Sequence, residues 1–461
     1  MRIMSKPPAK PILDWVDRRF PLSALYNDHL KQYYTPKNLN IWYVFGSIGL
    51  TVLAIQLVTG IFLVMHYKPD AARAFASVEY IMRDVPWGWL IRYMHSTGAS
   101  AFFVVMYLHM FRALLYGSYR RPRELVWIVG CTILLALMAE AFLGYLLPWG
   151  QMSYWGAQVI VNLFNAIPVI GPDLALLIRG DYVVSDATLS RFFSLHVVLV
   201  PLALIALVVA HIMALHQVGS NNPDGIDIDA NTDAKGIPLD GIPFQPYYTV
   251  HDIFAVSVFL MVFFAVVFFA PNGGGYFLEA NNFIEADPLK TPSHIAPVWY
   301  FTPFYSMLRA TTDLMVDVFC VILAALGVIV LVRRGLGKRT KALAAIALLG
   351  AIVLLRMFDA KFWGVVVMGA SVLLLFFLPW LDRSPVRSIR YRPGWHKALY
   401  AVFVVDFLIL GTLGTRAPTA VGTYAAQALT ILYFTFFLAM PIWSRLGSFR
   451  PLPNRLNFTP H

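Results

Sequence analysis

The sequence has little charge for its length. Only 13% of its 461 residues are charged, whereas 59% are apolar. This balance excludes a disordered chain and a water-soluble protein of this size. It also excludes a typical nucleic-acid-binding protein, although 36 Lys and Arg outnumber 25 Asp and Glu. The composition therefore predicts an integral membrane protein that has no nucleic-acid partner. The excess of Lys and Arg over Asp and Glu must then be explained by the membrane.

Cysteine is scarce, and a secretion signal is not visible. Cys131 and Cys320 both lie within apolar runs, which excludes a disulfide framework and a thiolate cluster for iron and sulfur. Residues 1–40 are polar, carry seven Lys or Arg, and contain no short apolar stretch followed by a small-residue cleavage site. We therefore expect no cleaved signal peptide and a cytoplasmic amino terminus.

Long apolar runs are abundant. Ten of them approach the roughly 20 residues that a spanning helix needs, which predicts an all-α integral membrane fold with about ten transmembrane helices. Ten spans put both termini on one side of the bilayer, and 24 of the 36 Lys and Arg lie on that side. Because Lys and Arg in short loops resist translocation, both termini are expected in the cytoplasm. The predicted spans cover about 41–65, 93–116, 126–147, 190–215, 252–270, 314–332, 341–357, 362–380, 398–414 and 424–443.

Four of the eleven histidines lie inside two of these spans. His95 and His109 are on the second span, and His196 and His211 are on the fourth. The 14 residues from His95 to His109 make nearly four helical turns, so both imidazoles share one face at two depths. The fourth span runs in the same direction and has its histidines at matching depths. This pattern predicts two six-coordinate haems stacked across the membrane, each held by one imidazole from each helix.

The residues around the histidines agree with haem better than with the alternatives. A hydrogen bond to a neighbouring helix would explain any single histidine, and zinc would need more than two ligands at each depth. Arg92 lies three residues before His95, and Arg112 lies three after His109. Each guanidinium therefore sits where haem propionates would point toward water, although a positive-inside anchor would explain Arg112 alone.

Two glycine pairs repeat the same spacing. Gly46 and Gly60 on the first span, and Gly130 and Gly144 on the third, are also 14 residues apart. A porphyrin face needs close approach of the backbone, which glycine permits. Small-residue helix packing is the alternative, but it would favour shorter spacings. We therefore expect the first four spans to form a four-helix bundle that binds two haems.

Longer motifs extend this interpretation. The chain resembles the cytochrome b subunit of the cytochrome bc complex (quinol:cytochrome c oxidoreductase), proteobacterial type. The resemblance covers nearly the whole chain except about 313–358. It rests on RYMHSTGASAFFVVMYLHMFR (92–112), GYLLPWGQMSYWGA (144–157), RFFSLH (191–196), LHQVGSNNPDG (215–225), PYYTVHD (246–252), HIAPVWYFTPFYSMLRA (294–310) and DRSPVRSIRYRP (382–393).

The resemblance implies two haems b and two quinone sites. His95 with His196 would hold the haem near the outer surface, and His109 with His211 the haem near the cytoplasm. Ubiquinol would be oxidised at the outer site, with one electron leaving to an iron–sulfur partner. The other electron would cross through both haems and reduce quinone at the inner site, which contributes to proton translocation. The family motifs assign the outer site to Tyr145, Pro297, Trp299 and Tyr300, and the inner site to His216, Ser220 and Asp252.

The resemblance also implies a setting, which is the bacterial inner membrane. The expected partners are a Rieske iron–sulfur protein and a membrane-anchored c-type cytochrome, in a homodimer of the complex. From the residues alone, a capping or interfacial role for His216 or Asp252 is the simpler interpretation. Two other function classes stay open. A secondary transporter would fit ten spans, although no inverted repeat is evident, and a haem-bearing anchor of a dehydrogenase would lack the APVWY loop.

The sequence departs from the family pattern at the second histidine pair. His196 and His211 are 15 residues apart, where the mitochondrial-type members have 14. One extra residue rotates the second imidazole by about 100° unless the helix is locally unwound. Pro201 removes a helical hydrogen bond, so we expect a bulge near it.

A second departure concerns the acid of the family's Pro-Glu-Trp-Tyr motif, which is commonly assigned to accept a proton from quinol. Val298 occupies that position here. We predict that Glu140 compensates, because it lies within the third span about one turn before Tyr145, and a carboxylate in a membrane is costly without a role. The alternative is a neutral Glu140 that is hydrogen-bonded to a neighbouring helix or faces a haem edge.

A third departure is an apparent extra hairpin of two spans. We expect it to be peripheral, because the other eight spans account for the family's full set. Two long outer loops, about 148–189 and 271–312, should be functional or contain short helices. The predicted organisation is a cytoplasmic segment (1–40), the haem-binding bundle (41–215), a quinone-site region with the APVWY loop (216–312), the extra hairpin (313–358) and carboxy-terminal spans (359–461).

Overall fold

The computed structural model describes residues 11–27, 33–335 and 337–456. Among these residues, ten helices are long and apolar enough to cross a membrane, which confirms the predicted all-α fold and its ten spans. The spans are α3 (Phe45–Val64, preceded by the 3₁₀ turn η2, Ile41–Tyr43), α5 (Gly88–Tyr116), α6 (Glu124–Leu146), α9 (Asp186–Ser194) continued by η3 (Leu195–Leu199) and α10 (Val200–Val218), α11 (Phe244–Phe269), α13 (Asp313–Val332), α14 (Lys338–Met357), α15 (Ala360–Leu373) continued by η8 (Leu374–Phe377) and α16 (Leu378–Leu381), α17 (Gly394–Thr415) and α18 (Ala420–Leu438).

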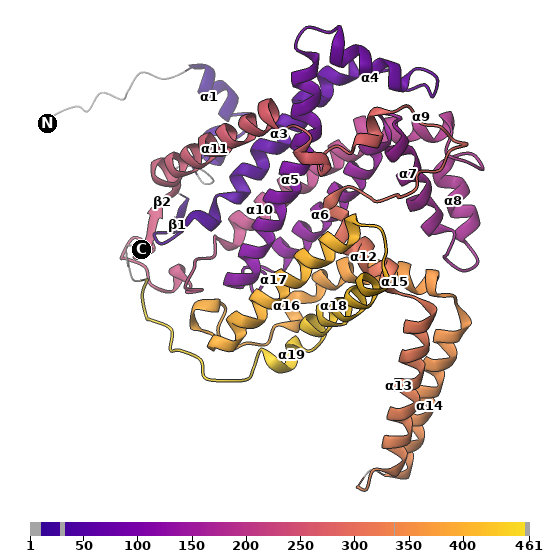
Figure 1. Ribbon diagram of the computed structural model, residues 1–461. Helices are drawn as coiled ribbons and strands as arrows, with labels where there is room; N and C mark the ends of the chain where they lie inside the picture. The colour runs from indigo at the N-terminus through magenta and orange to yellow at the C-terminus, as the bar shows by residue number, and fades with distance from the viewer. Residues whose placement is uncertain (1–10, 28–32, 336, 457–461) are drawn as a thin grey trace, which may run out of the picture.

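Short helices fill the connections between the spans, and the two long outer loops contain several of them, as expected. The first outer loop forms α7 (Gln151–Phe164) and α8 (Gly171–Arg179), and the second forms η6 (Ala280–Phe283), η7 (Trp299–Phe301) and α12 (Thr302–Ala310). In Figure 1, α7, α8 and α9 lie at the opposite end of the molecule from the two β-strands. The remaining short helices are α1 (Pro11–Asp17), α2 (Leu22–Tyr26), α4 (Ala74–Arg83), α19 (Met440–Trp443) and the 3₁₀ turns η4 (Ile228–Ala230), η5 (Gly273–Gly275) and η9 (Ile389–Tyr391).

Polar caps start several of the spans. The side chains of Thr312, Asp359 and Thr419 precede α13, α15 and α18, and each accepts a hydrogen bond from a backbone N–H in the first turn. Such a cap satisfies one of the backbone donors that a helix leaves unpaired at its amino end. The spans therefore begin where a short polar residue meets an apolar run.

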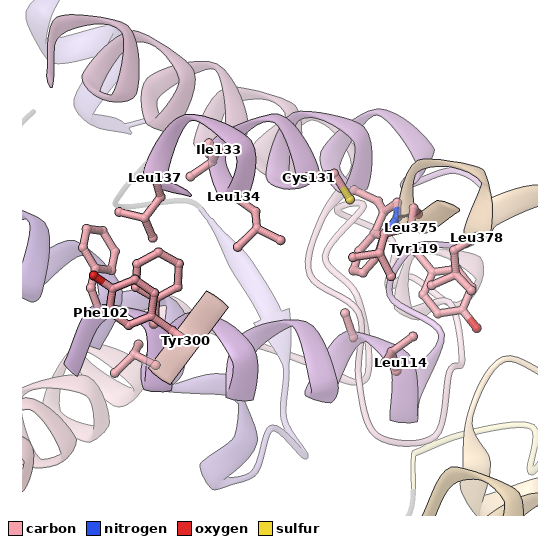
Figure 2. Packing of buried hydrophobic residues seen from close by; sticks show 14 of the residues in the cluster. Phe102, Leu114, Tyr119, Cys131, Ile133, Leu134, Leu137, Tyr300, Leu375 and Leu378 are labelled. Carbon is pink, nitrogen blue, oxygen red and sulfur yellow. Dashed lines mark hydrogen bonds between the residues drawn. The ribbon is translucent and has the colours of Figure 1, made fainter. Parts of the chain in front are cut away.

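The first four spans form the predicted bundle. Helix α3 packs along α5, and α6 packs along α10. A continuous hydrophobic core runs from this bundle to α12, α17 and α18. Figure 2 shows Phe102 beside Tyr300 at one end of this core and Tyr119 beside Leu378 at the other. The core therefore links the bundle to the segment that carries Tyr300.

A small two-stranded sheet joins the segment before the first span to the loop before α11. Strand β1 (Tyr34–Pro36) pairs antiparallel with β2 (Gly241–Pro243). Beside it, the buried carboxylate of Asp240 forms ion pairs with Lys37 at 2.8 Å and with Arg455 at 2.9 Å. The chain just before the first span, the loop before α11 and the carboxy-terminal segment therefore meet at one carboxylate.

The extra hairpin stands apart from the rest of the molecule. Helices α13 and α14 pack against each other and project from the body in Figure 1. An ion pair of 2.7 Å joins Asp317 to Arg356 across the hairpin. No residue of α14 is buried by the described part of the chain.

Candidate functional site

The structure brings the four intramembrane histidines together as two pairs. The ring centres of His95 and His196 are 6.2 Å apart, and those of His109 and His211 are 6.4 Å apart. Two iron–imidazole bonds of about 2 Å each, with the ring radii added, separate two ring centres by about 6 Å. Each pair therefore has the spacing that one six-coordinate iron requires.

A π-helical segment resolves the extra residue between His196 and His211. Residues Leu195–Leu199 form this segment, and the N–H of Val200 donates to the carbonyl of Leu195, a step of five residues. A π-turn accommodates one more residue than an α-helical turn. The expected local unwinding is confirmed, and it lies just before Pro201, in the turn whose hydrogen bonding that residue interrupts.

The outer pair of histidines is held through its Nδ1 atoms. The Thr59 hydroxyl lies 2.9 Å from Nδ1 of His95. Nδ1 of His196 lies 3.0 Å from the carbonyl oxygen of Glu140 and 3.0 Å from its carboxylate. Because Nδ1 is engaged in each case, Nε2 is the ring nitrogen left for a metal.

The four glycines face these imidazoles. An ideal Cβ on Gly46, Gly60 or Gly130 would lie 3.2–3.4 Å from Cε1 of a histidine, and one on Gly144 would lie 2.8 Å from Nδ1 of His196. Each of these glycines faces an imidazole of the adjacent helix; that they admit a porphyrin face stays a prediction. The imidazoles lie opposite the glycines because α3 packs against α5 and α6 packs against α10. The contacts are Gly46 with His109, Gly60 with His95, Gly130 with His211, and Gly144 with His196.

The two arginines lie beside the histidine pairs. The guanidinium of Arg112 lies over the ring of Tyr43, 4.4 Å from its centre. Nη1 of Arg112 is 3.4 Å from the Ser118 hydroxyl, and its buried Nε has no hydrogen-bond partner within the described part of the chain. Arg92 lines the same cavity as His95. An unpaired buried N–H of this kind fits an anionic group such as a haem propionate.

One cavity joins the outer histidine pair to the APVWY segment. It has a volume of about 450 Å³, within the range of sites for small ligands. His95 and His196 line one part of it, and Tyr145, Val298 and Tyr300 line another. A molecule bound beside the APVWY segment would therefore share its cavity with the outer metal position.

The APVWY segment is fixed by its aromatic rings. Pro297 leads into Val298, which is buried, and η7 begins at Trp299. The Trp299 indole N–H donates to the Ser100 hydroxyl at 3.0 Å. The Tyr300 ring stacks on Phe103 with centres 3.9 Å apart. These contacts hold the segment against α5, the helix that carries His95.

Two carboxylates lie near this cavity: Glu140 lines it, and Glu279, which the sequence did not single out, is hydrogen-bonded to Tyr145. The Tyr145 hydroxyl donates a hydrogen bond of 2.6 Å to the Glu279 carboxylate. Burial raises the pKa of the Glu279 carboxyl, and the bond from Tyr145 offsets part of the shift. The only sequence signal was a carboxylate in the loop before the APVWY motif. Glu285 and Asp287 carry the same signal, so only the folded loop selects Glu279.

The three residues assigned to the inner site have different neighbours. The His216 ring stacks on Tyr33 with centres 4.4 Å apart. The Ser47 hydroxyl donates to the Asp252 carboxylate at 2.7 Å. The Ser220 hydroxyl donates to the carbonyl of Asn221 at 3.1 Å.

Comparisons with known proteins agree with this geometry. The family model described as Cytochrome b/b6/petB matches residues 30–219. The model described as Cytochrome b(C-terminal)/b6/petD matches 285–342 and 348–434. The second match includes most of the hairpin. The resemblance therefore extends into 313–358, which the sequence motifs had left out.

Similar proteins include several from bacteria. Cytochrome b of Allochromatium vinosum is 54% identical over 448 residues, which cover 96% of this chain and 98% of that protein. Cytochrome b of Rhodospirillum rubrum is 46% identical and covers 96% of this chain and 95% of that protein. The cytochrome b/c1 of Bradyrhizobium diazoefficiens is 41% identical, with 98% of this chain aligned to 57% of that protein. A solved chain of a hyperthermophilic respiratory Complex III superposes with a TM-score of 0.76 and 36% identity, covering 94% of this chain and 98% of that one.

Proposed function

Because the chain belongs to the cytochrome b family, we propose that it is the dihaem subunit of a bacterial respiratory quinol:cytochrome c oxidoreductase. The single observation that carries this proposal is the presence of two histidine pairs. The ring centres are 6.2 Å apart in one pair and 6.4 Å apart in the other. Two such pairs in one four-helix bundle suit electron transfer across a membrane better than binding of a transported solute. The likeness to a respiratory Complex III supports membership of a multi-subunit complex.

Each histidine pair would hold one haem b. His95 and His196 would ligate the haem near the outer surface, and His109 and His211 the haem near the cytoplasm. Iron coordinated by imidazole on both faces has no open position, so these haems supply one-electron transfer when bound. Arg92 and Arg112 would neutralise the propionates.

Ubiquinol would be oxidised in the outer cavity. Tyr145, Trp299 and Tyr300 would orient the quinol ring, and Pro297 and Val298 would shape the wall beside it. The shared cavity supports this assignment, because it joins Tyr145 and Tyr300 to the outer histidine pair. Quinol gives up two electrons and two protons there, and the electrons leave to two different acceptors, the partner iron–sulfur protein and the outer haem.

Quinone would be reduced at the cytoplasmic end of the bundle. His216, Ser220 and Asp252 are the proposed residues of this inner site. The carboxylate of Asp252 and the imidazole of His216 would supply protons to the reduced quinone. Protons would thereby be released outside and taken up inside, so the reaction would contribute to proton translocation.

The proposed setting is the bacterial inner membrane, with both termini in the cytoplasm and the complex assembled as a homodimer. A Rieske iron–sulfur protein and a membrane-anchored c-type cytochrome are the proposed partners. The relative named cytochrome b/c1 supports the second of these, because its name joins the two cytochromes in one protein.

A visible spectrum of the purified protein with a haem count tests the proposal. We expect two haems b per chain, and a protein without haem would instead favour a transporter. Quinone analogues of the outer-site and inner-site types should each stop a separate electron-transfer reaction in the complex. Inhibition by only one type would favour a haem-bearing anchor of a dehydrogenase.

A further inference from the structure

We propose that Glu279 accepts a proton from quinol at the outer site, through the hydroxyl of Tyr145. This inference rests on the proposed function and concerns the position where Val298 replaces the family's acid. The sequence predicted that Glu140 of α6 compensates for that missing acid. The proposal assigns this role to Glu279 instead, which lies in the loop between α11 and the APVWY segment.

The contact between Tyr145 and Glu279 carries the proposal. The phenol lines the cavity that also contains Val298 and Tyr300, and its hydroxyl donates to Oε2 of Glu279 at 2.6 Å. A hydroxyl that is hydrogen-bonded to a carboxylate can pass its proton along that bond. The phenol therefore lies between the cavity and a carboxylate that is ready to take its proton.

The loop that carries Glu279 is held in place just beyond this residue. The Ser153 N–H donates to the side-chain oxygen of Asn282 at 2.9 Å, and the Gln151 N–H donates to the carbonyl of Ile284 at 2.8 Å. A Cβ on Gly150 would lie 2.5 Å from the Asn282 carbonyl oxygen, so this glycine permits the close approach. The start of α7, which follows Tyr145 in the chain, thus fixes Glu279 opposite Tyr145.

Glu140 is engaged elsewhere. It lines the same cavity, but its carboxylate lies 3.0 Å from Nδ1 of His196. That contact suits a group that orients an axial ligand. Of the two carboxylates, only Glu279 is hydrogen-bonded to a hydroxyl beside the APVWY segment.

The electrostatic surroundings favour proton transfer to Glu279. The titratable side chains that face it are Tyr145 from α6 and Tyr300 from η7. Burial raises the pKa of the Glu279 carboxyl, which brings it nearer to the working pH, where a general base is most effective.

The quinol O–H bond breaks, and its proton bonds to the phenolic oxygen of Tyr145 while the phenol's own proton moves to Oε2 of Glu279. Quinol would thereby be oxidised to quinone: its second proton would leave with the electron that the partner iron–sulfur protein accepts, and its other electron would go to the outer haem. Glu279 then releases its proton to the outer aqueous side and is ready for another turnover.

The test compares Glu279→Gln with Glu285→Gln in the assembled complex. Glu285 is an exposed carboxylate in the same loop, so it matches the change in charge. Quinol-driven haem reduction is measured with the inner site blocked by a quinone analogue, from pH 5 to 9. We expect a loss of about a hundredfold in Glu279→Gln, which is the usual size of a general-base contribution, and no loss in Glu285→Gln. The rise in rate with pH that reflects ionisation of Glu279 should also disappear.

Haem reduction through the inner site, with the outer site blocked, reports whether the variant is intact. If Glu279→Gln lowers that rate too, the substitution has disturbed the loop. The role of Glu279 is then tested with Tyr145→Phe and Glu279→Asp. Tyr145→Phe should lose the same pH-dependent rate, and Glu279→Asp should recover part of it. If Tyr145→Phe keeps the wild-type pH profile, the proposal is overturned.

Other results separate the two proposals. A wild-type complex that does not oxidise quinol at a blockable outer site overturns the proposed function. An active wild-type complex with an unchanged rate and pH profile in Glu279→Gln overturns only the role of Glu279. A loss of the pH-dependent rate in Glu140→Gln but not in Glu279→Gln would return the role to Glu140.

Discussion

Gly144 faces the imidazole of His196 so closely that no side chain fits between them. An ideal Cβ on Gly144 would lie 2.8 Å from Nδ1 and 2.9 Å from Nε2 of His196. The other three glycines leave more room, with the nearest histidine carbon at 3.2–3.4 Å from the corresponding Cβ. Of the four contacts, this one is therefore the least tolerant of an added methyl group.

We predict that Gly144→Ala loses most of the outer haem and keeps the inner one. Overpacking costs about 1–3 kcal/mol, enough to lower haem occupancy about tenfold, because His196 must move to admit the methyl group. Redox difference spectra of the purified complex measure each haem. Gly369→Ala is the matched control, since a Cβ on that glycine of α15 would lie more than 4 Å from every described atom beyond its chain neighbours and the nearby backbone of its own helix. An outer haem at full occupancy in Gly144→Ala would contradict the packing argument.

We predict that His109→Ala removes the inner haem and leaves the outer one in place. Only His211 would remain at the inner position, and a single imidazole cannot complete a six-coordinate iron. The haem count should fall from two to one per chain, with the outer haem still reducible by quinol. Two haems per chain in this variant would refute the assignment of His109 as a ligand.

We predict that removal of the hairpin 313–358 leaves the haem spectrum unchanged. Helices α13 and α14 pack mainly on each other, and none of the cofactor residues lies in them. The deletion is measured by the haem count and by quinol oxidation in the assembled complex. Loss of either haem, or an experimental structure with these helices lining a quinone site, would show that the hairpin is not peripheral.

We predict that the cluster of Asp240 with Lys37 and Arg455, called here the Asp240 clamp, loosens in acid. Hydrogen bonds from Arg455 and Lys37 lower the pKa of the Asp240 carboxyl. Because its folded pKa is below its unfolded pKa, its stabilisation is fully present above the unfolded value, about 4, and is lost as pH falls through the folded pKa. Limited proteolysis of the terminal segments should therefore accelerate in acid.

Asp240→Asn provides the comparison for this clamp. It should show the faster cleavage already at neutral pH, because the amide cannot form the two ion pairs. Asp233→Asn, at an exposed carboxylate in the same connection, should behave like the wild type. Equal cleavage rates for all three proteins at neutral pH would show that the clamp does not hold the termini.

Much of the site could be predicted because helices are periodic. A step of 14 residues returns a side chain to nearly the same face after four turns, so the positions of His95 and His109 along the chain are enough to mark two depths. The 15-residue step from His196 to His211 required a local departure from the α-helix, and the proline nearby indicated where. The glycines were found by the same spacing, but their partners were not, because spacing along one helix does not specify which group on the next helix lies opposite.

The sequence by itself determined the ten spans, the two histidine pairs and the family, because apolar length, helical period and contiguous motifs are local properties of the chain. Only the tertiary structure decided which carboxylate is hydrogen-bonded to the Tyr145 hydroxyl. Glu140 was the natural candidate by depth along α6, yet its carboxylate lies against His196. Glu279 comes within 2.6 Å of Tyr145 through a loop whose hydrogen bonds to the start of α7 join residues more than 100 positions apart. Such contacts depend on how an irregular loop packs, and no periodic pattern in the sequence encodes them.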